Sequence, residues 1–504
     1  MATTEATEVL TPPLAAPPPA NPQPPRLLVP LALVFLTVAW WAVFVLNNGI
    51  FIDESVYIRT GRAYITHWIY GTPLPDWVGE GFSGLPMIYP VLAGGLDILG
   101  GLAAVRLFSL VCILATMMLL RSIATSLFNR RTGLVTAVTF GLTGPVVYVG
   151  HLGTFDALVI LMLVTAWWLG MRADWKIALL LGPLLALAVA TKYTAYVFVP
   201  TVLVLSTFMP YAMTHSTTLR TWLHPRLPWS RIVRAAIAGL ITAGLLALGY
   251  MFTNDTIREA LSFTTTGRSA LSPTPRAQLA GMVPNFIWPT LFAALLGLVW
   301  LLRARRWTAV LWGVVLIGTS LLLPIAQIKL GEGVSFHKHL AYSAAFLAPL
   351  AGWGFSRPWK LAIWTPVLVW WLILMGFWGA FRSHDLIQYP DVRPVIEEAR
   401  FTTGGTYLSS SADSMSYYTR LDPNIEWETT FELYAQGPEA IREAVRKYRY
   451  EQIIIHAGNT GSTIQDEGQK VLLKELDQGF YDVEQAGEEG EWLIYTPLSM
   501  SQDD

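Results

Sequence analysis

The sequence predicts a polytopic α-helical membrane protein with a C-terminal α/β domain. Three observations predict this class. Hydrophobic residues make up 53% of the 504 residues and charged residues only 14%, whereas a soluble domain carries about 25% charge. Apolar segments of roughly 17 to 25 residues, long enough to span a bilayer, recur along the chain. Trp is abundant, at 21 residues, as in the aromatic belts of membrane interfaces.

Charge and cysteine content exclude several classes. The formal net charge of −1 argues against a nucleic-acid partner, which would require a basic patch. The single cysteine, Cys112, lies in an apolar run, so no internal disulfide can form and a cysteine-based metal site is not expected. We find no glycine-rich loop of the nucleotide-binding types.

Composition divides the chain into three regions. We expect a disordered, Pro-rich cytoplasmic tail at 1–25, a transmembrane domain at 26–383 whose first outer loop is 50–101, and a soluble extracytoplasmic α/β domain at 384–504. In that last domain the pattern predicts strands at 406–409, 452–456 and 491–495 and helices at 438–448 and 465–476.

About eleven membrane helices are predicted. They fall at 27–49, 102–127, 132–149, 156–171, 177–191, 193–209, 232–252, 286–302, 308–327, 340–356 and 361–380. Two of them meet at Thr191-Lys192-Tyr193, where a hairpin of short helices and a single long helix both fit. Arg and Lys collect in alternate loops only with the hairpin and a cytoplasmic N-terminus. This favours the hairpin and a multi-pass protein of the plasma or inner membrane, with its C-terminal domain outside.

The first outer loop begins with an acidic pair, Asp53 and Glu54, directly after an apolar helix. A solvated helix end explains the position equally well, but apolar flanks predict partial desolvation, which raises a carboxylate's proton affinity. After the pair, Glu54–Trp68 has the pattern of a helix lying in the interface, and Met87–Leu99 is too short to span and also lies flat.

A second acid, Asp156, and several cations also fall on the outer side. Asp156 starts an apolar helix, where a first-turn acid is favourable in any case. Lys192 lies at the turn of the hairpin, and the cluster at 337–339 is His337, Lys338 and His339. Arg258, Arg268 and Arg276 lie in the loop 253–285. Each cation could bind phosphate or simply extend its charged end to the interface; two histidines two residues apart are a weak metal signal.

These features in order resemble the GT-C superfamily of membrane glycosyltransferases, in its bacterial branch of lipid A aminoarabinose transferases and protein O-mannosyltransferase-like proteins. The resemblance covers about residues 27–350. It rests on Asp53-Glu54-Ser55-Val56-Tyr57, Pro86-Met87-Ile88-Tyr89-Pro90, Asp156 and Thr191-Lys192. Aminoarabinose transferases carry Glu-Lys before the Pro of the first loop, where this chain has Phe82-Ser83-Gly84-Leu85-Pro86. This departure argues against aminoarabinose transfer.

The resemblance implies an inverting transferase that moves a sugar, hexosyl or pentosyl, from a polyprenyl-phosphate donor to a lipid, glycan or protein acceptor on the outer face. It implies catalytic roles for Asp53, Glu54 and Asp156, with Asp53 as the base. Lys192, His337, Lys338, His339 and Arg268 would hold the donor phosphate, and Tyr57 and Tyr89 would face the acceptor in the loop. No metal ligand is assigned, and a divalent metal is left open.

Two other functions fit the composition. A transporter or flippase of lipid-linked or sugar substrates would place ionisable residues near the bilayer midplane and show paired broken helices. A non-enzymatic assembly protein would use the outer α/β domain to bind a partner. The acidic residues predicted at the outer surface argue against the transporter, and the α/β domain permits the assembly function without requiring it.

Overall fold

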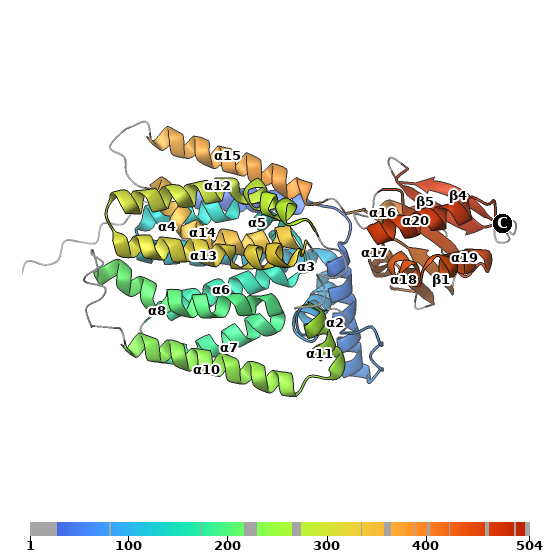
Figure 1. The fold of residues 1–504 in the computed structure, drawn as a ribbon, viewed down its shortest axis with the longest axis horizontal. Coiled ribbons are helices and arrows are strands. Elements are labelled where there is room, and N and C mark those ends of the chain that lie inside the picture. The colour runs from blue at the N-terminus through green and yellow to red at the C-terminus, as the bar shows by residue number, and fades with distance from the viewer. Residues whose placement is uncertain are drawn as a thin grey trace, which may run out of the picture.

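The protein is a long bundle of helices followed by a small α/β domain (Figure 1). The structure is a computed structural model. It describes residues 28–79, 82–172, 174–215, 229–264, 274–333, 335–356, 364–387, 389–399, 401, 404–422, 424–458, 463–487 and 490–498. The predicted tail at 1–25 lies outside these residues.

Helices account for nearly all of the described chain as far as Asp385. They are α1 (Leu28–Trp40), continued by the π-helix η2 (Trp41–Val45), α2 (Ile52–Tyr70), α3 (Tyr89–Leu127), α4 (Arg130–Gly141), α5 (Gly144–His151), α6 (Phe155–Gly170), α7 (Lys176–Thr191), the 3₁₀ helix η3 (Tyr193–Phe198), α8 (Val199–His215), α10 (Trp229–Met251), α11 (Asp255–Ser262), α12 (Arg276–Arg303), α13 (Trp307–Leu330), α14 (Phe336–Ser356) and α15 (Trp364–Asp385). Every predicted membrane segment is mainly helical.

The protein is a multi-pass membrane protein by the length and composition of these helices. Within the described residues, 6 helices are long and apolar enough to cross a bilayer, or 7 if α4 and α5, bent by 66°, form one span. Three further apolar helices, at Leu31–Val45, Phe155–Gly170 and Leu179–Thr191, are shorter than this. The count of eleven and the sidedness of the termini stay predictions.

Two breaks in the helices fall where the sequence pattern changes. Lys192 has extended backbone, with φ −146° and ψ 117°, and separates α7 from η3, so the alternative of one long helix is wrong. Gly100 and Gly101 interrupt α3, and Gly101 has φ 65°, in the left-handed region that favours glycine. The second break separates Met87–Leu99 from the membrane helix that follows it.

The helix α2 runs crosswise to the long helices of the bundle and lies across the end that faces the C-terminal domain (Figure 1). Helices that span a bilayer run roughly along its normal. A helix crosswise to them therefore lies along the membrane surface, as predicted for 54–68. The acidic pair at the start of α2 is thus at the end of the bundle and not at its middle.

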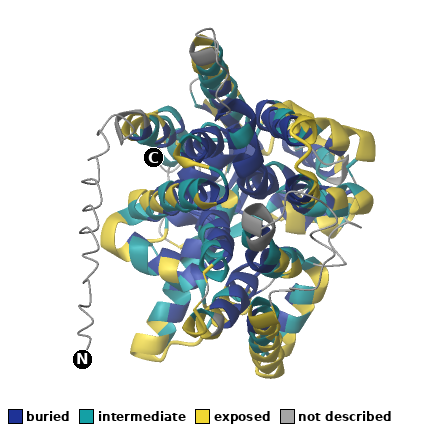
Figure 2. Ribbon diagram, turned by 90° about the vertical axis from the view of Figure 1, so that its left-hand side faces the viewer, coloured by how far each residue is buried: buried dark blue, intermediate teal, exposed yellow. Residues whose placement is uncertain are grey.

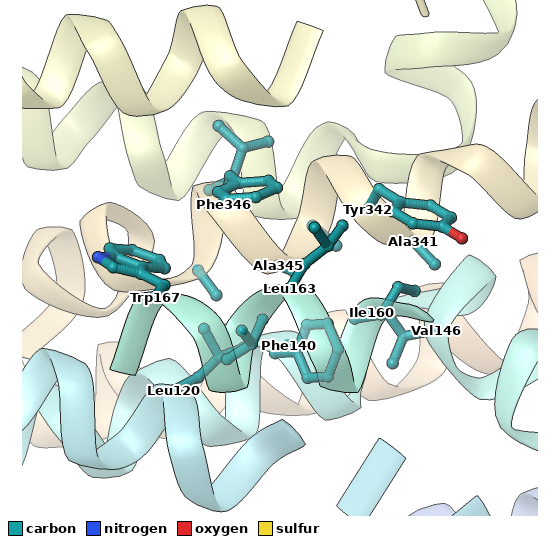
Figure 3. Close-up of a cluster of buried hydrophobic side chains, with 14 of the residues drawn as sticks. Leu120, Phe140, Val146, Ile160, Leu163, Trp167, Ala341, Tyr342, Ala345 and Phe346 are labelled. Atoms are coloured by element: carbon teal, nitrogen blue, oxygen red, sulfur yellow. The ribbon is translucent and has the colours of Figure 1, made fainter. Parts of the chain in front are cut away.

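The centre of the bundle is closely packed around α14, whose residues are mostly buried, while exposed residues lie on the outer helices (Figure 2). Small residues allow this approach: a Cβ on Gly297 of α12 would lie 2.3 Å from the Leu350 carbonyl oxygen, as in small-residue interfaces of membrane helices. Further along α14, Phe346 stacks on Trp167 of α6, with ring centroids 6.0 Å apart (Figure 3). Because α14 is packed into this core, the position of its first turn, close to the end of the bundle, is fixed.

The C-terminal domain is a five-stranded sheet with helices. Its strands are β1 (Gly405–Ser409), β2 (Ile425–Thr429), β3 (Gln452–His456), β4 (Tyr481–Ala486) and β5 (Trp492–Pro497), and its helices are α16 (Arg393–Glu398), α17 (Ala412–Tyr418), α18 (Thr430–Ala435), α19 (Pro438–Arg446) and α20 (Thr463–Leu476). The strand order is β2-β1-β3-β5-β4. β1 pairs in parallel with β2 and β3, and β5 pairs antiparallel with β3 and β4.

The three predicted strands and two predicted helices of this domain are confirmed, with small shifts at their ends. β2, β4 and the helices α16 to α18 were not predicted. The short helices have 6 or 7 residues, too few to show a 3.6-residue period. In β4 only the first and last residues are buried. The strand therefore lacks the alternation of buried and exposed residues that is typical of a half-buried strand.

Candidate active site

The acidic pair at the start of α2 is divided between the protein surface and the interior. Asp53 and Glu54 occupy the first turn of α2, where the helix dipole stabilises negative charge. Consecutive helical residues point about 100° apart, so the two carboxylates have different surroundings. The Asp53 side chain keeps 29% of its surface exposed, whereas Glu54 is completely buried.

Glu54 joins three separate parts of the chain. Its carboxylate accepts hydrogen bonds from the Arg106 guanidinium at 2.9 and 2.7 Å and from the Gly153 N–H at 2.6 Å. Arg106, on α3, also donates to the backbone carbonyl of Asn48, at 3.0 Å. All these contacts point away from solvent. Glu54 therefore ties the start of α2 to α3 and to the loop before α6.

The ionisation of Glu54 differs from what its apolar flanks predicted. Burial alone would raise the pKa of Glu54, but the Arg106 guanidinium and the Gly153 N–H outweigh burial and lower that pKa below its usual value. The expectation of a desolvated, more basic carboxylate is therefore wrong for Glu54. An ionised Glu54 is the counter-ion for Arg106, whose side chain is only 12% exposed.

Asp53 forms an ion pair with Lys338. Lys338 lies in the first turn of α14, its side chain is 3% exposed, and its ammonium donates to Asp53 Oδ2. The ammonium also lies 5.1 Å from the centroid of the Phe51 ring, a favourable cation–π distance. The pair links the start of α2 to the start of α14, most of whose residues are buried.

Asp156 and Lys192 form a second, deeper ion pair. Asp156 is fully buried in the first turn of α6, and the Lys192 ammonium donates to its Oδ1. The Tyr342 hydroxyl donates to the same oxygen at 3.1 Å, and the Thr154 hydroxyl donates to Oδ2 at 3.2 Å. Buried charges persist when they are paired and hydrogen-bonded, and Asp156 meets both conditions.

A cavity of about 260 Å³ lies where α2, η3, α13 and α14 meet. Five of the predicted site residues line it: Asp53, Tyr57, Lys192, Lys338 and His339. They come from three separate parts of the chain, namely α2, the break between α7 and η3, and the start of α14. The cavity thus brings the partly exposed Asp53 carboxylate and two ammonium groups to a single space at the end of the bundle, and the Glu332 side chain also lines it.

Four of the other predicted site residues do not line this cavity: Glu54, Asp156, His337 and Tyr89. The fifth, Arg268, lies outside the described residues. His337 packs against Tyr148, with ring centroids 5.6 Å apart. Tyr89 packs edge-on against Tyr57 at 5.8 Å. Asp156 and Tyr89 each contact a residue of the cavity wall and lie behind it.

The two histidines of the 337–339 cluster have separate neighbours. Nδ1 of His339 lies 2.7 Å from the Gln327 side-chain oxygen, so this nitrogen carries the proton. His337 faces Tyr148 instead. Among the described residues, no group of three or more His, Cys, Asp or Glu side chains could hold a metal ion, so we derive no step through a metal.

Arg106, Tyr342 and Gln327, which contact predicted site residues, were not predicted. Glu332, in the cavity wall, was not predicted either. Arg106 could have been found, because an isolated charge in an apolar segment calls for a buried partner. Tyr342 and Gln327 lie on α14 and α13 without any local signal. Only the packing of these helices brings them to Asp156 and His339.

Comparison with known proteins identifies a similar fold. Residues 84–245 match the family model described as dolichyl-phosphate-mannose-protein mannosyltransferase. Among solved structures, ArnT from Cupriavidus metallidurans bound to undecaprenyl phosphate is similar with a TM-score of 0.61 and 13% identity, over 94% of this chain and 98% of that one. The apo state of the same protein gives 0.59 and 14%, over 94% and 99%.

A more distant fold relative is the archaeal oligosaccharyltransferase AglB from Archaeoglobus fulgidus, in complex with an inhibitory peptide and a dolichol-phosphate. It is similar with a TM-score of 0.51 and 11% identity, over 94% of this chain and 74% of that one. Comparison with curated protein sequences gives no match. The described helices and the C-terminal sheet thus have an ArnT-like arrangement.

Proposed function

We propose, from the match to the mannosyltransferase family model and the ArnT-like fold, that this chain is a GT-C membrane glycosyltransferase that transfers a sugar from a polyprenyl-phosphate donor to an acceptor hydroxyl with inversion. The observation that carries the proposal is the cavity in which Asp53 meets Lys338 and Lys192 at the end of the bundle. The undecaprenyl phosphate bound to ArnT and the dolichol-phosphate bound to AglB support a lipid-linked donor.

The reaction needs one base and a cationic environment. Asp53 takes the proton from the acceptor hydroxyl, the acceptor oxygen forms a bond to the anomeric carbon, and the bond from that carbon to the lipid phosphate breaks with its electrons going to the phosphate. One displacement inverts the anomeric configuration. Asp53 suits the role of base because its carboxylate lines the cavity, is partly exposed and lies beside the Lys338 ammonium.

Lys338 connects the base to the donor. Its ammonium binds Asp53 and lines the same cavity. A donor phosphate in the cavity would compete with Asp53 for Lys338, and a carboxylate released from a cation accepts a proton more readily. Lys338 would then stabilise the charge that develops on the departing phosphate. Donor binding would thereby prepare the base.

Lys192 supplies a fixed positive charge. Asp156 holds it from behind the cavity wall, and Tyr342 and Thr154 hold Asp156. A cation whose position is set before the reaction stabilises developing charge without having to reorganise. We therefore assign Lys192 to the phosphate and Asp156 to orienting Lys192.

Tyr57 and His339 complete the cavity wall near these groups. Tyr57 packs against Phe155 and Tyr89, with centroids 4.8 and 5.8 Å away, and it lines the cavity one helical turn after Asp53. We assign Tyr57 to the acceptor side, with Tyr89 supporting its ring. His339 donates Nδ1–H to Gln327, which fixes the ring beside Lys338.

The transporter alternative is less well supported. Transporters place their ionisable groups near the bilayer midplane, whereas Asp53 and Lys338 lie at the ends of α2 and α14 beside the C-terminal domain. The assembly-protein alternative does not account for the ion pairs in the cavity. Uptake of a labelled substrate into vesicles would support the transporter.

The test is sugar transfer by purified protein in lipid, from a panel of labelled hexosyl and pentosyl polyprenyl phosphates. Wild type is compared with Asp53→Asn and with Asp76→Asn, a change in an exposed loop. We expect transfer by wild type and Asp76→Asn but not by Asp53→Asn, and the active donor identifies the sugar. Full activity of Asp53→Asn would remove Asp53 as the base.

A further inference from the structure

The C-terminal domain holds both sides of the short segment that carries Asp53. Upstream, the Gly49 N–H donates to Asp391 Oδ2 at 3.2 Å, and the Ile50 N–H donates to the Tyr418 hydroxyl at 3.1 Å. The Ser414 hydroxyl donates to the Ile50 carbonyl at 3.3 Å. These bonds fix the backbone just before α2 begins.

Downstream, a single residue of α17 contacts α2 twice. The Ser55 hydroxyl donates to the backbone carbonyl of Asp413, and the Arg59 guanidinium pairs with the Asp413 carboxylate at 3.3 Å. Both side chains of the ion pair are 28% exposed. A partly buried pair of this kind is less screened by salt than a surface pair. Ser55 and Arg59 are four residues apart, so they lie on one face of α2.

A third contact links the same face of α2 to α3. The Tyr417 hydroxyl donates to Asp97 Oδ1 at 2.7 Å, and Arg62 pairs with the other oxygen of Asp97 at 2.5 Å. Asp97 lies before the Gly100–Gly101 break in α3 and its side chain is fully buried. Residue Arg62 follows Arg59 by three positions and continues the face that α17 contacts.

The wall of the cavity is formed by other residues of α2. Ile52, Asp53, Val56 and Tyr57 line the cavity, and Asp53 precedes Ser55 by two residues, which is about 200° around the helix. α2 therefore contacts α17 with one face and lines the cavity with the adjoining one. A shift of α17 would move the Asp53 carboxylate.

We propose that α17 of the C-terminal domain positions the Asp53 carboxylate, with Asp413 and Tyr417 as positioning residues. The inference rests on the proposed function. A displacement of about 1 Å in a reacting group can lower a rate about 100-fold, so loss of these contacts lowers turnover more than donor affinity. Three charged groups face Asp413: Arg59, Glu432 and Asp53. Burial raises the pKa of Asp413, and the carboxylates of Glu432 and Asp53 raise it further, while the Arg59 guanidinium lowers it.

The test measures kcat and donor KM for Asp413→Asn, Arg59→Gln and the charge exchange Asp413→Arg with Arg59→Asp. We expect each single change to lower kcat at least about 10-fold with KM within about 3-fold, because α2 moves while Lys192 does not. The charge exchange should recover a large part of kcat. The control is Glu439→Gln, which removes an exposed ion pair with Arg442 and should leave kcat unchanged.

A second readout needs no substrate. Amide hydrogen exchange over residues 49–59 should be faster in both single variants than in wild type and should return toward wild type in the charge exchange. Unchanged exchange, or faster exchange with an unchanged kcat, overturns the proposal. If Asp413→Asn does not fold, Tyr417→Phe is measured in the same way; it removes only the hydroxyl, which bonds Asp97 and the Leu102 backbone. An inactive wild type would count against the proposed function instead.

Discussion

Asp53 and Lys338 are ion-paired although 285 positions separate them in the chain. Each lies in the first turn of its helix, and each lines the cavity at the end of the bundle. The candidate base and its nearest cation thus come from opposite ends of the transmembrane domain. Packing of α14 in the core brings them together.

Replacing Lys338 tests whether its positive charge contributes to the reaction. We expect Lys338→Gln to lower kcat about 100-fold, because it removes a cation from the departing phosphate. Lys329→Gln, an exposed lysine at the end of α13, is the matched control and should retain wild-type kcat. Initial rates with a labelled donor give both values, and a wild-type rate for Lys338→Gln would remove Lys338 from the reaction.

Asp156 and Lys192 should behave as a coupled pair. We expect Asp156→Asn and Lys192→Met each to destabilise the protein by about 3–5 kcal/mol, because either change leaves a buried charge alone. The double variant should be more stable than either single variant but inactive. Thermal unfolding in detergent and transfer rates are measured for wild type, both single variants and the double variant, which together make a double-mutant cycle. Additive losses of stability would mean that the two side chains do not interact.

Hydropathy was sufficient to predict most of the bundle, because a bilayer requires long apolar helices. The break at Lys192 also followed from sequence, since only a hairpin makes Arg and Lys alternate across the membrane. In the C-terminal domain, strands with continuous apolar runs such as β3 were predicted. β4 was not, because its middle residues are exposed on both faces.

The site was predictable in composition but not in arrangement. Asp53, Lys192 and Lys338 were singled out by charge at the ends of apolar helices, and they share one cavity. The helical period implied that Asp53 and Glu54 face different ways, but not which one faces inward. The Arg106 contact decides that, over a separation of 52 residues. The contact of α17 with α2 had no sequence signal, because it joins two domains through single side chains.

Glu54 should contribute to stability in a pH-dependent way. Its pKa is lowered on folding from an ordinary value of 4.5, so the folded protein binds this proton less readily than the unfolded chain. The stabilisation is therefore complete above about pH 5 and is lost as the pH falls through the lowered folded pKa. Glu54→Gln should be less stable than wild type at pH 7, and the difference should shrink in acid. Thermal unfolding across pH measures this, and a constant difference would contradict it.

Gly153 should tolerate no side chain, because two groups of the site approach it closely. An added Cβ would lie 2.7 Å from Val105 Cγ1 and 3.2 Å from the Glu54 Oε1 that its N–H binds. We expect Gly153→Ala to destabilise the protein by about 1–3 kcal/mol through overpacking and to weaken the contact between Glu54 and Arg106.

The control for Gly153→Ala is Gly244→Ala, on α10, where an added Cβ meets nothing within 4 Å. An alanine there improves helix propensity and should leave stability equal or slightly higher. Thermal unfolding of both variants in the same detergent compares them. Equal stability of the two variants would show that the loop at Gly153 can move away from Val105, and the fixed geometry inferred for Glu54 would then lose its support.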